Sequence, residues 1–126
     1  MSYKTTWEKK GIVWEYSGVV SPEDILNSNK EFYQDSKSDS TTYQIVDLSN
    51  IDNIDLDEFS VEAVAAMDFA ESLSVRNVKV AFVISVPGIK EAINKYIELA
   101  VKLQTSWSFK IFDDINSARE WVSGAK

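Results

Sequence analysis

Strand-like and helix-like segments alternate along this chain, and the alternation limits the folds open to it. Short apolar runs predict strands, whereas apolar residues spaced three and four apart predict helices. The predicted strands cover residues 3–7, 12–16, 43–48, 78–85 and 107–112, and the predicted helices run over about 22–33, 59–72, 89–103 and 115–122. Repeated strand–helix units build a sheet of mostly parallel strands joined by right-handed crossovers.

The first two predicted strands form a hairpin, because Lys9, Lys10 and Gly11 lie between them and a glycine-containing turn joins antiparallel strands. The expected fold class is therefore α/β with the order β-β-α-β-α-β-α-β-α. We expect a mostly parallel sheet of about five strands, with an antiparallel N-terminal edge hairpin and four helices. The segment 34–41 is rich in Ser and Asp without periodicity, which predicts a surface loop. With 126 residues, we expect a single domain over 1–126.

The composition argues against several classes of function. The chain has no cysteine and no histidine, so it lacks thiolate chemistry, the commonest general base and the commonest zinc ligand. Its net charge of −7 argues against nucleic acid, which binds clustered lysine and arginine. No apolar run approaches the roughly 20 residues that span a bilayer, and the polar start of the chain does not resemble a secretory signal. We expect a soluble, cytoplasmic protein that is not an enzyme and has no cofactor.

Acidic residues gather at the predicted strand-to-helix junctions. They are Glu23, Asp24, Asp47, Asp52, Asp55, Asp57, Glu58, Glu62, Asp113 and Asp114. Such junctions meet at the carboxyl ends of parallel strands, where α/β proteins usually bind ligands. The spacing lacks the alternating ligands and the glycine of a calcium loop. Helix capping and solubility explain most of these residues, so no metal site is predicted.

The most specific motif lies in residues 45–59. It consists of a strand ending in Asp-Leu-Ser at 47–49, a short turn anchored by Ile51 and Ile54, and an acidic helix start. This pattern resembles the centre of the STAS domain, the fold of the sporulation anti-sigma-factor antagonists. More distantly, the order of elements is similar to that of a bacterial STAS-like group related to the CRAL-TRIO lipid carriers, whose biochemical role is poorly defined.

The STAS resemblance implies a regulatory module that has lost its switch. In that family a phosphorylatable serine followed by glycine opens the helix, and the matching positions here are Asp57 and Glu58. Phosphoserine carries about −1.5 to −2 charges that can be removed, whereas the charge of an aspartate is fixed. Two interpretations of Asp57 stay open: a permanent mimic of the phosphorylated state, or an ordinary helix cap. Ser60 is a less favoured alternative site of modification.

The same resemblance implies a contact surface for a protein partner or for a second copy in a homodimer. This surface would comprise the loop at residues 50–57 and the first turn of the helix that follows. Its residues are Ser49, Asn50, Asp52, Asp55, Asp57, Glu58 and Ser60.

Aromatic residues give a second candidate site, which comprises Trp7, Trp14, Tyr16, Tyr96 and Trp107. The hairpin carries more apolar area than one small helix can cover, and exposed apolar patches usually mark contacts. Three interpretations are open: a surface for self-association, a cavity near Tyr96 and Trp107 for a small hydrophobic ligand or lipid, and plain core packing.

Overall fold

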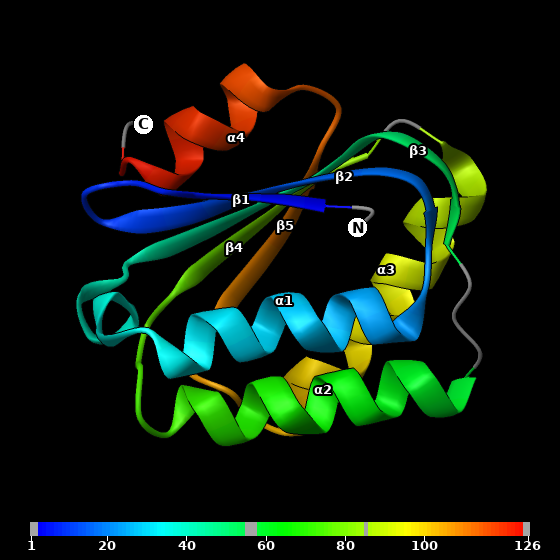
Figure 1. Ribbon diagram of the computed structural model, residues 1–126. Coiled ribbons are helices and arrows are strands. Elements are labelled where there is room, and N and C mark those ends of the chain that lie inside the picture. The colour runs from blue at the N-terminus through cyan, green and yellow to red at the C-terminus, as the bar shows by residue number, and fades with distance from the viewer. Residues whose placement is uncertain (1–2, 55–57, 85, 125–126) are drawn as a thin grey trace.

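The protein is described here by a computed structural model, which describes residues 3–54, 58–84 and 86–124. Five strands form one sheet in the order β1-β2-β3-β4-β5, in which β1 is antiparallel to β2 and every other neighbouring pair is parallel (Figure 1). The strands are β1 (Tyr3–Trp7), β2 (Gly11–Val20), β3 (Tyr43–Ile54), β4 (Lys79–Val83) and β5 (Ser108–Phe112). The predicted sheet and its N-terminal edge hairpin are confirmed.

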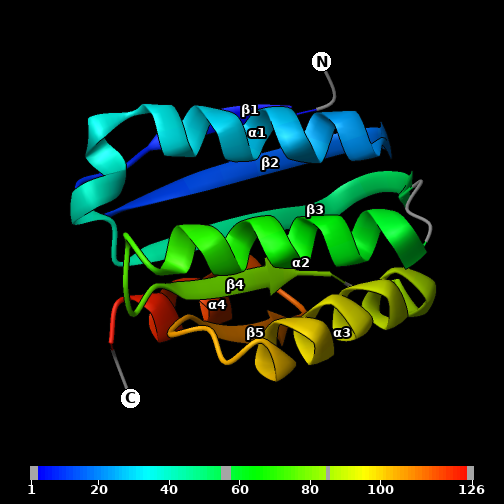
Figure 2. The same cartoon turned by 90° about the horizontal axis from the view of Figure 1, so that it is seen from below.

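The helices cover the two faces of the sheet unequally. Three helices lie across one face, α1 (Pro22–Gln34), α2 (Glu58–Ser72) and α3 (Pro87–Lys102), as Figure 2 shows. The fourth, α4 (Ile115–Val122), lies on the opposite face (Figure 1). The larger core therefore lies beneath the three-helix face, and a smaller core lies under α4.

Strand alternation divides the apolar residues between these two cores. Along β2, Ile12, Trp14 and Tyr16 point to the three-helix face, whereas Val13 points to α4. In β4, Val80 to Val83 are all buried, as expected for a strand covered on both faces. Fully burying a side chain of this size stabilises the fold by about 1.5–3 kcal/mol.

Two helices begin where the sequence places capping residues. The Ser21 hydroxyl accepts a hydrogen bond from the backbone N–H of Asp24, whose carboxylate accepts one from the Ser21 N–H. Asp114 caps α4 by accepting from the N–H of Ser117 at 2.8 Å. Such caps satisfy N–H groups that have no partner within the helix.

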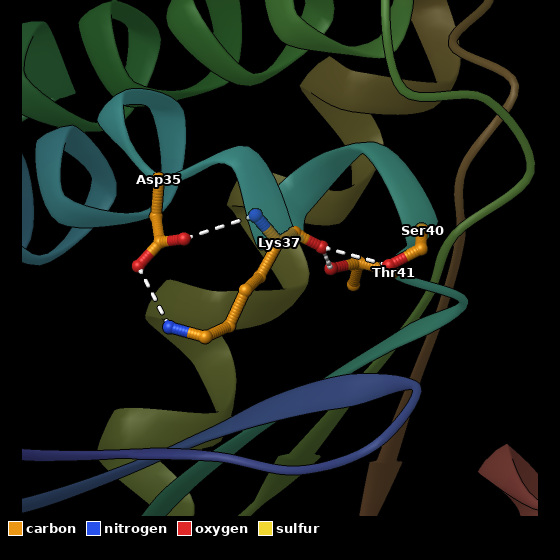
Figure 3. Close-up of polar contacts among 4 residues, drawn as sticks. All are labelled: Asp35, Lys37, Ser40 and Thr41. Carbon is orange, nitrogen blue, oxygen red and sulfur yellow. Dashed lines mark hydrogen bonds and ion pairs between the residues drawn. The ribbon is translucent and has the colours of Figure 1, made fainter.

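The predicted surface loop at 34–41 contains a 3₁₀ helix, η1 (Ser36–Ser40). Local polar bonds hold it (Figure 3): the Asp35 carboxylate accepts from the N–H of Lys37, and the Lys37 carbonyl accepts from the hydroxyls of Ser40 and Thr41. The predicted surface loop therefore contains one short helical turn, because short-range side-chain bonds can order a segment without apolar periodicity.

The third strand is longer than its apolar run. Residues 50–54, expected as a turn, continue β3 to Ile54, because β2 also continues to Val20 and supplies backbone partners. The boundary of this strand was therefore predicted six residues too early, since its last part is polar and partly exposed.

Candidate functional site

The outer ends of β2 and β3 extend beyond the rest of the sheet. Asp47 pairs with Val83, the last residue of β4, so that the later residues of β3 pair only with β2 within the described part of the chain. We call residues 17–20 and 49–54 the ribbon. Figure 1 shows both strands curving here towards the helices of the three-helix face.

Two bulges bend the ribbon. β3 contains one residue more than β2 between the pairs Glu15–Asp47 and Ser17–Asn50. It contains one more again between the pairs Gly18–Ile51 and Val19–Asn53. Extra residues of this kind bend a strand and increase its twist. Gly18 has a φ of +68°, a conformation that side chains disfavour, so the bend favours glycine at this position.

The Asp47 side chain stabilises the first bulge. Its carboxylate accepts hydrogen bonds from the backbone N–H of Ser49 at 3.0 Å and from the Ser49 hydroxyl at 2.6 Å. An Asx-type bond of this kind offers the backbone an alternative to regular strand pairing. The Asp-Leu-Ser sequence therefore has a local structural role, because these hydrogen bonds stabilise the bulge that bends the ribbon away from the sheet.

Three residues of the predicted contact surface lie exposed on the ribbon: Ser49, Asn50 and Asp52. Asp55 and Asp57 lie outside the described residues, so both interpretations of Asp57 stay predictions. Glu58 and Ser60 belong to the first turn of α2, whose side chains are likewise outside the description.

The predicted aromatic site lies mostly inside the molecule. Trp14, Tyr16, Tyr96 and Trp107 are buried in the three-helix core, while Trp7 is half-buried and stacks on Phe32 with ring centroids 6.0 Å apart. Four of these five side chains therefore offer little outer surface to a second copy of the chain.

A cavity of about 70 Å³ lies between the sheet and the three helices. Trp14, Tyr16 and Tyr96 line it, Trp107 does not, and Val20 and Ile54 line it from the end of the ribbon. An engineered cavity of about 150 Å³ takes one benzene molecule, so this one has no room for a lipid. Whether the cavity holds a smaller ligand stays a prediction.

Asp68 is the charged member among the described residues that line the cavity, and the sequence patterns did not single it out. Its carboxylate accepts hydrogen bonds from the hydroxyl of Tyr96 and, at 3.3 Å, from that of Tyr33. These bonds join α1, α2 and α3. Burial raises the pKa of Asp68 to about 6, while the two tyrosine hydrogen bonds oppose that rise. A perturbed carboxyl group in a cavity is typical of functional sites.

Two buried amides, Asn29 of α1 and Gln44 of β3, also line the cavity and were likewise missed. A sequence signal for them did exist. Each of Asn29, Gln44 and Asp68 is a polar residue at a position where the helical or strand period calls for an apolar one. That signal identifies polar groups directed into a core, although it does not show that they meet.

Two negative findings concern the described part of the chain. No group of three acidic side chains there lies close enough to hold a metal ion. None of its helices is both long and apolar enough to cross a membrane.

Comparisons with known proteins identify the fold. No family model and no curated protein sequence matches the chain. The anti-sigma factor antagonist SpoIIAA, solved in its unphosphorylated form, has a similar structure, with a TM-score of 0.59 over 97% of this chain and 98% of that one, at 12% identity. An uncharacterized DUF3478-family protein from Shewanella loihica PV-4, described as having a SpoIIAA-like fold, gives a TM-score of 0.55 over 95% and 91% at 16% identity. The chain thus has a STAS-like, SpoIIAA-like fold, as its central motif predicted.

Proposed function

We propose that this protein is a regulatory module that binds another protein through the ribbon and the start of α2, and that it acts without catalysis. The observation that carries the proposal is the ribbon itself. It projects beyond β4, it is bent by two bulges, and it leads from exposed polar residues to the start of α2. Bulges of this kind often re-aim side chains at functional sites, which supports the ribbon as a contact surface.

The likeness to SpoIIAA supports the proposal. That protein is described as an anti-sigma factor antagonist, a class that acts through other proteins. The motif at residues 45–59 that resembles STAS domains also lies at the ribbon and the junction with α2. Fold and motif therefore favour the same surface.

The charge of the ribbon indicates the chemistry of the partner. Glu15, Asp47 and Asp52 lie on or beside it, and residues 15–20 and 47–54 include neither lysine nor arginine. Val19 adds an apolar side chain that is 59% exposed. A partner with a basic face around a small apolar recess complements this surface, and such charge complementarity mainly sets specificity and association rate.

The arrangement around Asp68 supports binding rather than catalysis. One arrangement for general acid–base catalysis is a pair of carboxylates with separated pKa values. Among the described residues that line the cavity, Asp68 is the only carboxylate, and it is engaged by two tyrosines.

Charge-reversal and apolar-to-acidic variants test the proposal. Asp52→Lys and Val19→Glu should abolish capture of the partner from the native host while leaving the fold intact. The matched control is Leu73→Glu, because Leu73 is 62% exposed but follows the far end of α2. Capture unchanged in the ribbon variants would contradict the proposal. Light scattering checks whether the ribbon binds a second copy, in which case the wild type is a dimer and both ribbon variants are monomers.

A further inference from the structure

The first strand, β1, lies at an open edge of the sheet. It pairs with β2 alone among the described strands, and Figure 2 shows α1 running beside it. The N–H of Glu8 donates to the carbonyl of Gly11 at 2.8 Å, which makes these two residues a hydrogen-bonded pair at the turn. Hydrogen-bonded and non-hydrogen-bonded pairs alternate along antiparallel strands. The pairs that Tyr3, Thr5 and Trp7 form with β2 are therefore non-hydrogen-bonded ones.

Three residues of β1 consequently direct their backbone N–H and C=O groups away from the sheet. No backbone hydrogen bond to another described segment uses these groups of Tyr3, Thr5 or Trp7. An edge of this kind is a template for an extended peptide, which adds to the sheet as a further strand. In such an addition the main-chain hydrogen bonds give affinity, and the alternate side chains give specificity.

The side chains of the same three residues face the three-helix side of the sheet. The hydroxyls of Tyr3 and Thr5 donate to the Glu31 carboxylate at 3.1 Å and 3.0 Å, and Trp7 stacks on Phe32. Glu31 is partly exposed, and no lysine or arginine of the described residues forms an ion pair with it. A carboxylate without a cationic partner in the described part of the chain therefore lies beside the middle of the open edge.

An open groove lies between this edge and the end of α1. The described residues that line it are Thr5, Trp7, Glu31, Gln34, Asp35 and Ser36. The Asp35 carboxylate pairs with Lys37 at 3.3 Å, whereas Glu31 has only its two hydroxyl donors. The groove thus gives room to a side chain from an added strand and offers that side chain a negative charge.

The charge of Glu31 selects the occupant of the edge. If a second copy paired with β1 symmetrically about Thr5, two Glu31 side chains would approach the same two-fold axis and repel each other. A segment of another protein avoids this repulsion. A lysine or arginine opposite Thr5 would have its side chain on the same face, beside Glu31. On the other face, the exposed Lys4 favours an acidic residue opposite it.

We infer that the β1 edge binds an extended segment of a partner protein as an additional antiparallel strand, with a lysine or arginine of that segment bound to Glu31. Apolar residues two positions to either side of this basic residue lie opposite Tyr3 and Trp7. The binding surface belongs to β1 and α1, whereas the ribbon belongs to β2 and β3. The two surfaces are therefore able to bind different partners.

The peptide acetyl-Thr-Val-Thr-Lys-Glu-Val-Thr-amide is the probe, with its lysine opposite Thr5 and its glutamate opposite Lys4. Its binding to the full chain is followed in ¹H–¹⁵N correlation spectra. The amide signals of Thr5 and Trp7 should shift in a saturable way. Their exchange with solvent should slow more than that of Lys4 and Thr6, whose N–H groups already bond to β2. The absence of a saturable shift, or unchanged exchange of Thr5 and Trp7, would overturn the inference.

Two N-methylated peptides separate strand addition from simple attraction of charges. The backbone nitrogen of the peptide's lysine faces β1 in the added strand, so methylating it should abolish binding. The backbone nitrogen of the peptide's glutamate faces away, and methylating it should leave binding nearly unchanged. Equal binding of the two methylated peptides would contradict strand addition.

Variants of Glu31 test the contribution of its charge. Glu31→Gln keeps an acceptor for the two hydroxyls and should weaken binding about two- to fivefold, as expected for a partly exposed ion pair. Glu31→Lys should reverse the preference, so that a peptide with glutamate in place of lysine binds better than the original. Asp52→Lys makes the same change of net charge on the ribbon and should alter neither affinity. Equal effects of Glu31→Lys and Asp52→Lys would refute the site.

If Glu31→Lys does not give a folded spectrum, Glu31→Gln and the two methylated peptides still decide the question. A wild-type dimer in which the Thr5 and Trp7 amides are already protected without peptide would identify a second copy as the occupant and contradict the inference. The ribbon takes no part in these measurements, so their failure would leave the proposed partner surface untouched.

Discussion

Tyr96 of α3 donates a hydrogen bond to Asp68 of α2 in the interior of the protein, where neither side chain has an ionic partner among the described residues. This bond connects α2 with α3, two of the three helices that cover the larger core. It also positions Asp68, the one charged group among the described residues that line the cavity.

Removing the Tyr96 hydroxyl should destabilise the fold. Tyr96→Phe leaves the Asp68 carboxylate with Tyr33 alone, and an unsatisfied buried acceptor costs about 1–3 kcal/mol. Tyr33→Phe should cost less, because Tyr33 is half-buried and its bond is 3.3 Å long. Urea denaturation of both variants measures the difference. A Tyr96→Phe protein as stable as the wild type would show that this bond contributes nothing.

Stability should depend on pH through Asp68. Its pKa is raised to about 6 in the folded state, from an ordinary value of 3.8, chiefly by burial, with a smaller contribution from the negative charge of Glu71. The folded state therefore binds the proton more tightly. The stabilisation is fully present below about pH 4 and is lost as the pH rises to about 6, by roughly 1–3 kcal/mol.

The difference in stability between the wild type and Asp68→Asn isolates this effect from other carboxyl groups. Glu8, for example, has a pKa lowered mainly by its hydrogen bond to Arg119, so it changes stability in the opposite direction. The difference should fall between pH 4 and pH 7. A difference that stays flat or rises over that range would contradict the assignment.

Replacing the Gln44 amide, which lines the cavity, should stabilise the protein. Gln44→Met keeps the length of the side chain and removes a buried amide that has no partner in the described part of the chain, which should gain about 1 kcal/mol. Gln34→Met is the matched control, because Gln34 is exposed at the end of α1 and should change little. Thermal unfolding distinguishes the two. A less stable Gln44→Met protein would show that the amide already has a partner.

The bend of the ribbon should depend on Gly18. With φ at +68° and no atom within 4 Å of an added Cβ, Gly18→Ala meets no clash and only the backbone cost of about 1–2 kcal/mol. Gly88→Ala is the control, since Gly88 lies in the first turn of α3, also has open space around it and lacks a positive φ. That substitution should be neutral or stabilising by up to about 1 kcal/mol. Equal effects of the two variants would contradict the role of the bend.

Much of the fold could be predicted from local patterns. The hairpin around Gly11, the cap at Ser21 and the cap at Asp114 each depend on a few neighbouring residues. The length of β3 could not be predicted in this way. Its last residues are polar, and they become a strand because β2 extends to Val20 and the bulges adjust the register.

The cavity was less predictable than the fold because it depends on long-range packing. Tyr33 and Asp68 are 35 positions apart, and Asp68 and Tyr96 are 28 positions apart. The aromatic group was predicted from composition, but whether its members would be buried depended on three helices closing over one face. Only the part of the predicted contact surface at Ser49, Asn50 and Asp52 could be located as exposed residues.

Two variants of Asp57 test whether this residue is a helix cap or a mimic of phosphoserine. If it only caps α2, Asp57→Ala should lower stability by about 0.5–2 kcal/mol and leave partner binding unchanged. If it mimics a phosphate, Asp57→Arg should abolish partner binding at a similar cost in stability. Comparing thermal unfolding with partner capture for both variants decides between them.

Site-specific photo-crosslinking tests the proposed interface most directly. A photoreactive amino acid is placed at Asn50 on the ribbon, or at Leu73 beyond the far end of α2, and crosslinking is carried out in the native host. The position of Asn50 should give one discrete protein adduct, which excess wild-type protein suppresses and excess Asp52→Lys protein does not. An adduct formed only from the position of Leu73, or one that Asp52→Lys protein suppresses equally well, would contradict the ribbon as the binding surface.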